Sequence, residues 1–271
     1  LMQFIEQDCF VDSKEKIEYP PVALSFGEKV IKSNKIEGDL IVPIPIGTYG
    51  NLSVVTAPPK TKKTFFISLL ASCYLSGSNQ FGGDIKGHKG NDGQLVHIDT
   101  EQGLWHCQKV FERVHKMDSN IDSEIYHTFG LRSIDYKMRI EFIDYYLREK
   151  IKTPSLVIID GIADLCSDAN NISESNQVVQ KLMEWSAKYK CHIINVIHQN
   201  FGSSKLGTGH LGSFLEKKAE TVIQLEANTV NKDWVTVKCG RSRGYAFETF
   251  SFEVNEFGLP QIVGDLYDPL K

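Results

Sequence analysis

Short apolar runs alternate with amphipathic stretches along most of the chain, from about residue 52 onward. Six of these runs have the length expected of buried strands, and they cover residues 52–56, 94–99, 124–129, 156–160, 192–198 and 221–226. Four stretches between them carry apolar residues at helical spacing, over residues 64–75, 103–117, 133–150 and 175–190. Strands that alternate with helices are typical of parallel sheets. We therefore predict an α/β domain with a mostly parallel central sheet flanked by helices.

The two ends of the chain break this alternation. Residues 1–45 mix charged residues with four prolines, and we predict that they form an N-terminal extension packed on a core domain of residues 46–271. After the sixth strand, the segments WVTVKCG and ETFSFEVNEFGLP are rich in β-branched and aromatic residues, with FGLP as a turn. These segments predict a C-terminal antiparallel β extension that closes the sheet.

The segment LSVVT-APPKTKKT-FFISLLA places a short loop between the first strand and the first helix. This is the order of a P-loop, G-x-x-x-x-G-K-[ST], in which backbone N–H groups and the helix N-terminus bind phosphate. In that alignment Lys63 adds positive charge at the β- and γ-phosphates, and the Thr64 hydroxyl binds Mg²⁺. The predicted ligands are ATP and Mg²⁺, and the predicted phosphate-binding residues are Ala57, Pro58, Pro59, Lys60, Thr61, Lys62, Lys63 and Thr64.

The loop departs from the P-loop pattern at both glycines, where Ala57 and Lys62 stand. Glycine adopts a positive φ without a steric penalty, whereas another residue in the left-handed region loses about 1–2 kcal/mol. Taken alone, the loop is equally consistent with a lysine-rich turn that binds no nucleotide.

A second motif is the run Leu156 to Asp160, in which four apolar residues end in an aspartate. This is the Walker B pattern, where the carboxylate at the end of a strand holds Mg²⁺ through water. Asp160 therefore joins Thr64 as a predicted metal ligand. The alternative is that an aspartate before Gly161 only forms a turn.

With these motifs, residues 45–260 resemble the RecA-like ATPases, and among them the RepA-type hexameric helicases and related proteins of bacterial plasmids and mobile elements. Three further segments carry the resemblance: HIDTEQG (97–103), IHQN (197–200) and KCGRSRG (238–244). The resemblance implies a RecA-like P-loop NTPase fold. It also implies that the P-loop strand and the strand that ends at Asp160 are neighbours in the sheet.

The resemblance gives these segments roles in ATP hydrolysis. It implies that Glu101 is the general base that polarises the attacking water, and that Gln199 or His198 contacts the γ-phosphate. It further implies that Arg243, or else Arg241, reaches the γ-phosphate of a neighbouring subunit. The competing interpretations are that Glu101 only caps the next helix and that the arginines belong to a basic turn without a role.

Residues 202–221 resemble the DNA-binding loop of this family and the helix that follows it. The resemblance makes Lys205, His210, Lys217 and Lys218 possible contacts to the DNA backbone. A solvated Gly/Ser loop explains the same sequence nearly as well.

Composition restricts the partners and the compartment. The net charge is −4, so nucleic acid must bind to a local basic patch, which oligomerisation could assemble. No apolar run approaches the roughly 20 residues that span a bilayer, and residues 1–10 lack the pattern of a secretory signal. The six cysteines form no C-x-x-C pair, so they predict neither a zinc ribbon nor a redox site. We expect a cytoplasmic protein without a membrane partner.

The hypothesis that follows is a DNA-dependent ATPase or helicase-type motor of plasmid or mobile-element replication or mobilisation. It would act on single-stranded DNA as a homo-oligomeric ring or filament, because the arginine is supplied by another subunit. The first alternative is a degenerate accessory protein that binds nucleotide or single-stranded DNA without hydrolysis, and the missing glycines favour it. A recombination-type filament protein and a P-loop kinase or transferase also stay open.

Overall fold

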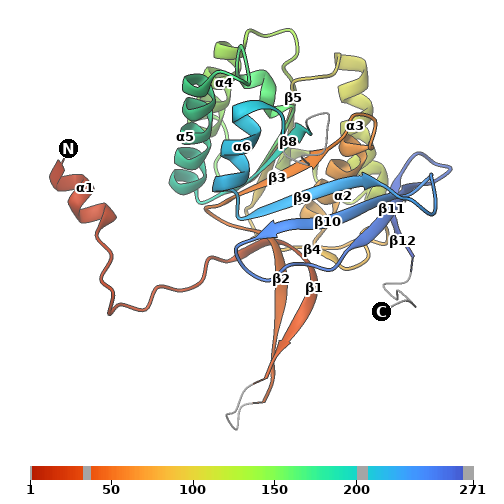
Figure 1. Ribbon diagram of the computed structural model, residues 1–271, viewed down its shortest axis with the longest axis horizontal. Coiled ribbons are helices and arrows are strands. Elements are labelled where there is room, and N and C mark those ends of the chain that lie inside the picture. The colour runs from red at the N-terminus through yellow and green to blue at the C-terminus, as the bar shows by residue number, and fades with distance from the viewer. Residues whose placement is uncertain (1, 33–37, 200–206, 265–271) are drawn as a thin grey trace.

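The computed structural model describes residues 2–32, 38–199 and 207–264. Within these ranges the chain forms a nine-stranded sheet of order β12-β11-β10-β9-β3-β8-β7-β5-β6 and a smaller sheet of order β2-β1-β4 (Figure 1). Six neighbouring strands of the large sheet are parallel. They are β3 (Leu52–Ala57), β5 (Gln94–Asp99), β6 (Tyr126–Gly130), β7 (Pro154–Asp160), β8 (His192–His198) and β9 (Thr221–Ala227). Each predicted central strand overlaps one of them, which confirms the mostly parallel sheet.

Three antiparallel strands extend this sheet beyond β9. They are β10 (Val235–Ser242), β11 (Phe250–Val254) and β12 (Pro260–Val263). The predicted antiparallel extension is therefore confirmed, and the predicted turn FGLP joins β11 to β12, with Pro260 as the first residue of β12.

Helices cover both faces of the sheet (Figure 1). On one side are α2 (Lys63–Ser76) and α3 (Leu104–Met117); on the other are α4 (Tyr136–Glu149), α5 (Ile172–Tyr189) and α6 (Gly209–Lys218). Alternate residues of one strand enter different cores: Leu156 and Ile158 pack with α2 and α3, whereas Val157 and Ile159 pack with α4, α5 and α6. A strand buried on both faces has no polar face, which is why the run is apolar throughout. Two short 3₁₀ helices, η1 (Ser123–Ile125) and η2 (Ile162–Leu165), complete the helical elements of the described ranges.

The small sheet belongs mainly to the N-terminal segment. It contains β1 (Val22–Ile31), β2 (Leu40–Thr48) and β4 (Ile85–Gly87), all antiparallel. The base of the β1–β2 hairpin is buried in the core, and its far half projects from the body (Figure 1). The sequence did not predict this hairpin because β2 contains two prolines. They are tolerated because β2 is an edge strand, where a residue without an N–H group breaks no ladder.

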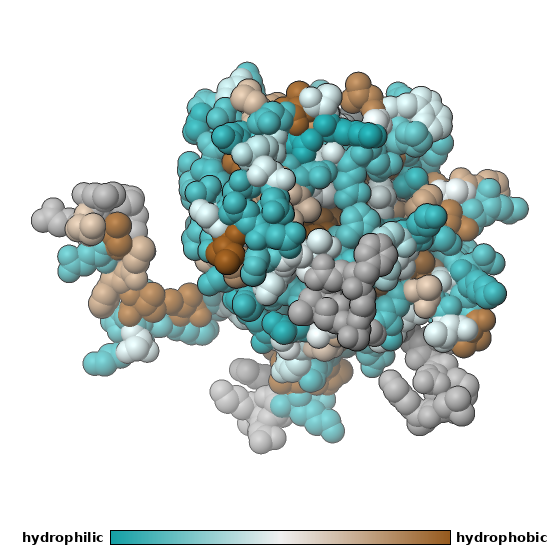
Figure 2. Space-filling model, turned by 45° about the horizontal axis from the view of Figure 1, so that its top comes forward, coloured by the Kyte–Doolittle hydropathy of each residue, from teal (hydrophilic) through white to brown (hydrophobic). Residues whose placement is uncertain are grey.

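The segment before the hairpin lies apart from the body. Helix α1 (Met2–Cys9) and the extended residues after it form an arm at the left of Figures 1 and 2, with exposed apolar side chains such as Phe10 and Val11. The division of the chain into an extension of residues 1–45 and a core of residues 46–271 stays a prediction.

The order of the central strands corrects one expectation. The P-loop strand β3 and the Asp160 strand β7 are not neighbours, because β8 lies between them and pairs with both. The order of the strands along the chain does not reveal this arrangement, because β8 follows β7 in sequence but lies between β7 and β3 in the sheet. The consequence is functional, because the end of β8, at His198, lies opposite Ala57 at the end of β3.

Two properties of the chain complete the description. No helix in the described ranges is both long and apolar enough to cross a membrane. All six cysteines are free thiols; four are buried, Cys239 is half-buried and Cys9 is exposed.

Candidate nucleotide-binding site

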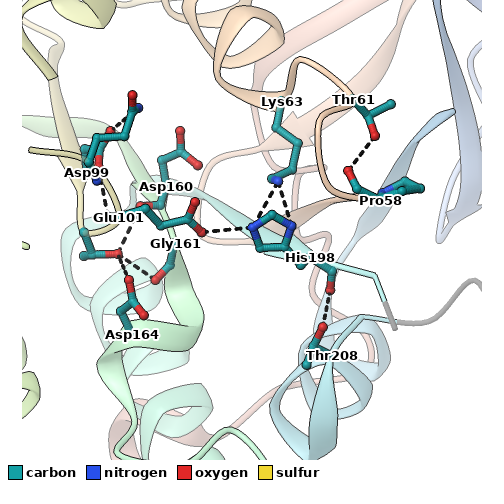
Figure 3. A network of polar contacts seen from close by, with 12 residues as sticks. Pro58, Thr61, Lys63, Asp99, Glu101, Asp160, Gly161, Asp164, His198 and Thr208 are labelled. Atoms are coloured by element: carbon teal, nitrogen blue, oxygen red, sulfur yellow. Dashed lines mark hydrogen bonds and ion pairs between the residues drawn. The ribbon is translucent and has the colours of Figure 1, made fainter. Parts of the chain in front are cut away.

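Four central strands end around one pocket at the carboxyl edge of the sheet. The loop after β3, the segment after β5 and the last residue of β8 border a cavity of about 320 Å³, with the end of β7 close behind (Figure 3). Its lining residues are Lys60, Thr61, Lys62, Lys63, Thr64, Phe65, Glu101, Gln102, Val110, Arg113 and His198. Ligands of open α/β sheets bind at this edge, where helix N-termini and strand ends converge.

The phosphate loop keeps its backbone shape despite the missing glycines. Lys62 has φ 56° and ψ 31°, which is the left-handed conformation that glycine adopts most easily, and Lys60 is also left-handed with φ 66°. Ala57 is not strained, because it is the last extended residue of β3 and its carbonyl accepts a hydrogen bond from Gln199 N. The steric penalty of a left-handed backbone therefore applies to Lys62 but not to Ala57. It also applies to Lys60, where the sequence did not predict it.

Helix α2 begins directly after the loop, so its first N–H groups face the pocket. The carbonyl of Lys62 accepts hydrogen bonds from Phe65 N and Phe66 N, which starts the helix, and no side chain caps it. The open N-terminus and the loop amides are therefore donors of the kind that bind anions. Pro58 and Pro59 lie at the exposed start of the loop, where the hydroxyl of Thr61 donates to the carbonyl of Pro58 (Figure 3).

Lys63 points into the site and contacts His198. Its side chain is buried, with 7% of the residue exposed, and Nζ donates to His198 Nδ1 at 2.9 Å. Burial lowers the pKa of Lys63, and the charges of Glu101 and Asp160 oppose that shift. On the other side, His198 Nε2 lies 3.5 Å from Glu101 Oε1 (Figure 3). This hydrogen bond to His198 is the main cause of the lowered pKa of Glu101.

Glu101 is not a helix cap. Helix α3 begins at Leu104 with Gly103 at its N-cap, and no side chain bonds to that cap. Gly161 gives Glu101 its room, because a Cβ on Gly161 would lie 2.7 Å from Glu101 Cγ and 2.3 Å from Thr100 Oγ1. The glycine after Asp160 thus allows two strand ends to approach closely, which a simple turn would not require.

Asp160 is a buried carboxylate in need of a cation. Only 2% of the residue is exposed, and neither carboxylate oxygen has a hydrogen-bond partner of normal geometry in the described part of the chain. Burial, followed by the charges of Asp99 and Glu101, raises the pKa of Asp160 to about 7; Thr64 lies close enough to lower it slightly. Because a buried, unpartnered carboxylate is costly, Asp160 and the Thr64 hydroxyl fit the Mg²⁺ that the P-loop pattern implies.

Asp99 ends the neighbouring strand but differs from Asp160. One of its oxygens accepts from Glu101 N and Gln102 N, and the other accepts from Gln102 Nε2 at 2.7 Å. Asp99 is therefore occupied by its own turn. Among the residues described, no group of three or more His, Cys, Asp and Glu side chains could hold a metal, so a bound Mg²⁺ would need ligands from phosphate and water.

The two candidate γ-phosphate contacts have different surroundings. Gln199 is buried, and its Nε2 donates to Thr56 Oγ1 at 3.2 Å within the sheet, outside the residues that line the pocket. His198 lines the pocket, and its carbonyl accepts from both N and Oγ1 of Thr208, the N-cap of α6. Only His198 of this pair faces the cavity.

Arg241 and Arg243 lie at the opposite edge of the sheet. Strand β10 runs antiparallel to β9, so Ser242 at its end pairs with Thr221 at the start of β9. Arg243 is exposed, and its guanidinium donates to the carbonyl of Lys218. Neither arginine is brought to the pocket of its own chain. A role at a neighbouring subunit's pocket stays a prediction.

Sequence reasoning missed Arg113 on α3. Its guanidinium covers the ring of Phe65 at 3.8 Å, and Nη1 donates to Ser68 Oγ. Burial lowers the pKa of Arg113 to about 10, and no carboxylate of the described ranges pairs with it. The available signal was a single arginine beside the buried positions Val110 and Val114 of an amphipathic helix.

Comparison with known proteins agrees with this geometry. Residues 45–203, more than half of the chain, match a family described as AAA domain. The fold is similar to the crystal structure of the RadB recombinase, with a TM-score of 0.54 and 15% sequence identity over 80% of this chain and 92% of that one. No curated protein sequence matches the chain. The chain belongs to the AAA domain family, and its fold is that of a RecA-like P-loop ATPase.

Proposed function

We propose that this protein hydrolyses ATP in a DNA-dependent manner, as a helicase-type motor of plasmid or mobile-element replication or mobilisation. The observation that carries the hydrolysis is the meeting of Lys63, His198, Glu101 and Asp160 at the end of four strands. The helicase group and the mobile-element context rest on the sequence resemblance alone.

The residues of the pocket divide the chemistry among them. The loop amides, the start of α2, Lys63 and Arg113 bind the phosphates and balance their charge. Glu101 Oε1 accepts a proton from the attacking water, and its lowered pKa keeps it ionised for that role. Thr64 and Asp160 would hold Mg²⁺, which would supply further charge neutralisation at the phosphate oxygens.

His198 connects the phosphate site to α6. Lys63 Nζ donates to His198 Nδ1, so a phosphate that bound Lys63 would compete with His198 for the same ammonium group. The carbonyl of the same residue anchors Thr208 and thereby the start of α6. Lys217 and Lys218 are exposed in the last turn of that helix and could contact DNA phosphates. Lys205, the other lysine predicted for this role, lies outside the described residues.

The position of the basic strand end supports a homo-oligomer. Arg241 and Arg243 are at the edge of the sheet remote from the chain's own pocket, so they complete a site only between two copies. A head-to-tail contact of this kind builds a ring or a filament. We expect single-stranded DNA as the partner inside such an assembly, and the cytoplasm, where free thiols persist, as its location.

Two alternatives each have an observation in their favour. A non-hydrolysing accessory protein is favoured by Lys60 and Lys62, which hold the loop in a conformation that glycine would adopt more easily. A recombination-type filament protein is favoured by the likeness to the RadB recombinase. For a P-loop kinase or transferase, which would need a second pocket for a small acceptor, we have no comparable observation.

Phosphate release in the presence and absence of single-stranded DNA tests the proposal. The native chain should release phosphate faster with DNA, and Lys63→Ala should reduce turnover by about 10²–10³-fold, the usual effect of losing a phosphate-stabilising group. Lys188→Ala, at an exposed position of α5, is the matched control. Nucleotide binding without turnover would favour the accessory protein, and equal turnover in both lysine variants would end the ATPase hypothesis.

A further inference from the structure

The phosphate loop is attached to a distant turn by one of its unusual lysines. Lys60 and Lys62 are both left-handed, but only Lys62 has a side-chain partner among the described residues. Its Nζ donates to the backbone carbonyl of Asp233 at 2.8 Å. Asp233 lies in the turn between β9 and β10, 171 positions along the chain.

Hydrogen bonds within the turn of residues 228–234 restrict the position of the Asp233 carbonyl. Asn228 Oδ1 accepts hydrogen bonds from Val230 N and Asn231 N, each at 2.9 Å. Asn231 accepts two further hydrogen bonds: its Oδ1 accepts from Asp233 N, and its carbonyl accepts from Trp234 N. A side-chain bond to such a turn is stronger than a bond to a mobile loop, because less freedom is lost on forming it.

We propose that Lys62 is a positioning residue, which ties the phosphate loop to the 228–234 turn and holds Lys63 toward the pocket. The inference rests on the proposed function, because the loop matters to ATP only if the pocket binds it. Lys62 replaces a glycine of the P-loop pattern, so the pattern itself gives its side chain no role in holding phosphate. The bond to Asp233 O offsets part of the left-handed penalty at this residue.

The hydrogen bond from Lys62 to Asp233 also links a residue inside the family match to one outside it. The match ends at residue 203, so Lys62 lies inside the matched residues and the turn lies outside them. Strand β10 starts at the turn and ends at Ser242, so the tether fixes one end of the strand that carries Arg241 and leads to Arg243.

Hydrogen exchange of the nucleotide-free protein tests the tether directly. In Lys62→Met the amides of Asp233 and Trp234 should exchange about fivefold faster, the factor that corresponds to one hydrogen bond of about 1 kcal/mol. Lys60→Met is the matched control, because Lys60 has the same backbone conformation without the contact. Lys62→Arg keeps a donor and should restore slow exchange.

A second variant tests the contact from the other side. Asn228→Ala loosens the turn, and it should speed exchange of the Phe65 and Phe66 amides, which donate to the Lys62 carbonyl, only while Lys62 is present. In the Lys62→Met background the effect on these two amides should vanish. Additive effects, or equal effects of Lys60→Met and Lys62→Met on the turn, would overturn the tether.

ATP affinity then separates a positioning role from a merely structural one. Measured by calorimetry with Mg²⁺, Lys62→Met should weaken ATP binding about three- to tenfold, and Lys62→Arg should recover most of it. A tether seen by exchange but without effect on affinity would overturn the positioning role. If the native chain binds no ATP, the proposed function fails with it, while the exchange experiment still decides whether the tether exists.

Discussion

The ammonium group of Lys63 donates to the imidazole of His198 at 2.9 Å, across 135 positions of sequence. The contact exists because β8 lies between the P-loop strand and the strand of Asp160. The residue at the end of β8 therefore lies between Lys63, the lysine proposed to bind phosphate, and Glu101, the glutamate proposed to polarise water. A change at His198 should affect catalysis more than binding.

Replacement of His198 by alanine tests this position. Loss of the imidazole removes the main cause of the lowered pKa of Glu101 and the hydrogen-bond partner of Lys63 Nζ. We expect the turnover number to fall about 10- to 100-fold while KM for ATP changes less than about threefold. His106→Ala, at an exposed position of α3, is the control. A variant that keeps its turnover and loses only affinity would show that His198 binds substrate and does nothing more.

Arg113 should contribute to nucleotide affinity. A half-buried guanidinium without a carboxylate partner is stabilised when an anion enters its pocket. We expect Arg113→Ala to weaken ATP binding about tenfold or more and Arg113→Lys to recover part of it, since lysine keeps the charge without the planar contact to Phe65. Lys109→Ala on the same helix is the control, because Lys109 is exposed and pairs with Glu112. Equal affinities in Arg113→Ala and Lys109→Ala would remove Arg113 from the site.

The buried carboxylate of Asp160 makes stability depend on pH when no metal is present. Its pKa rises from 3.8 to about 7 in the folded chain, so the folded state binds the proton more tightly than the unfolded state does. This group's contribution to the free energy of unfolding therefore decreases as pH rises from about 4 to 7, and stays low above 7.

Asp160→Asn removes that dependence. In a metal chelator at pH 8 the variant should be more stable than the native chain by about 2–4 kcal/mol, with the difference shrinking as pH falls toward 4. Thermal unfolding over this pH range measures it. The same variant should lose Mg²⁺-dependent hydrolysis, so a gain in stability would accompany a loss of function. An unchanged or lower stability at pH 8 would contradict the raised pKa.

The sequence predicted those features that depend on local patterns, and it failed for those that depend on contacts distant in sequence. Runs such as 156–160 located the parallel strands to within about two residues, because strands buried on both faces are apolar throughout. Lys63 and Asp160 were selected from the P-loop and Walker B patterns and Glu101 from the family resemblance, and the structure brings all three to the carboxyl edge of the sheet (Figure 3). The identity of neighbouring strands depends on contacts distant in sequence, so the insertion of β8 was not foreseen.

Other features were missed for local reasons. The choice between His198 and Gln199 was left open because successive residues of a strand point in opposite directions, and only the packing of β8 says which direction is the pocket. Arg113 lies twelve positions after Glu101 on a helix, where a basic residue usually faces solvent. The edge hairpin was hidden by its prolines, which normally argue against a strand.

The trans role of Arg243 can be tested with two inactive variants. Lys63→Ala destroys the pocket of a subunit but keeps its arginine, whereas Arg243→Ala keeps the pocket and removes the arginine. Because the two groups lie at opposite edges of one sheet, a head-to-tail assembly combines the pocket of one copy with the arginine of the next. Mixed in equal amounts, the variants should form intact sites at about a quarter of the interfaces and recover a comparable share of native turnover.

Recovery must require mixing, nucleotide and DNA, and it should follow the mass of the assembly measured under the same conditions. The same experiment with Arg241→Ala shows which of the two arginines is used. If the Arg243 mixture stays inactive while the Arg241 mixture recovers, the finger is Arg241. If Arg243→Ala alone retains native turnover and the native protein is a monomer under every condition, the site is complete within one chain and the ring or filament is wrong.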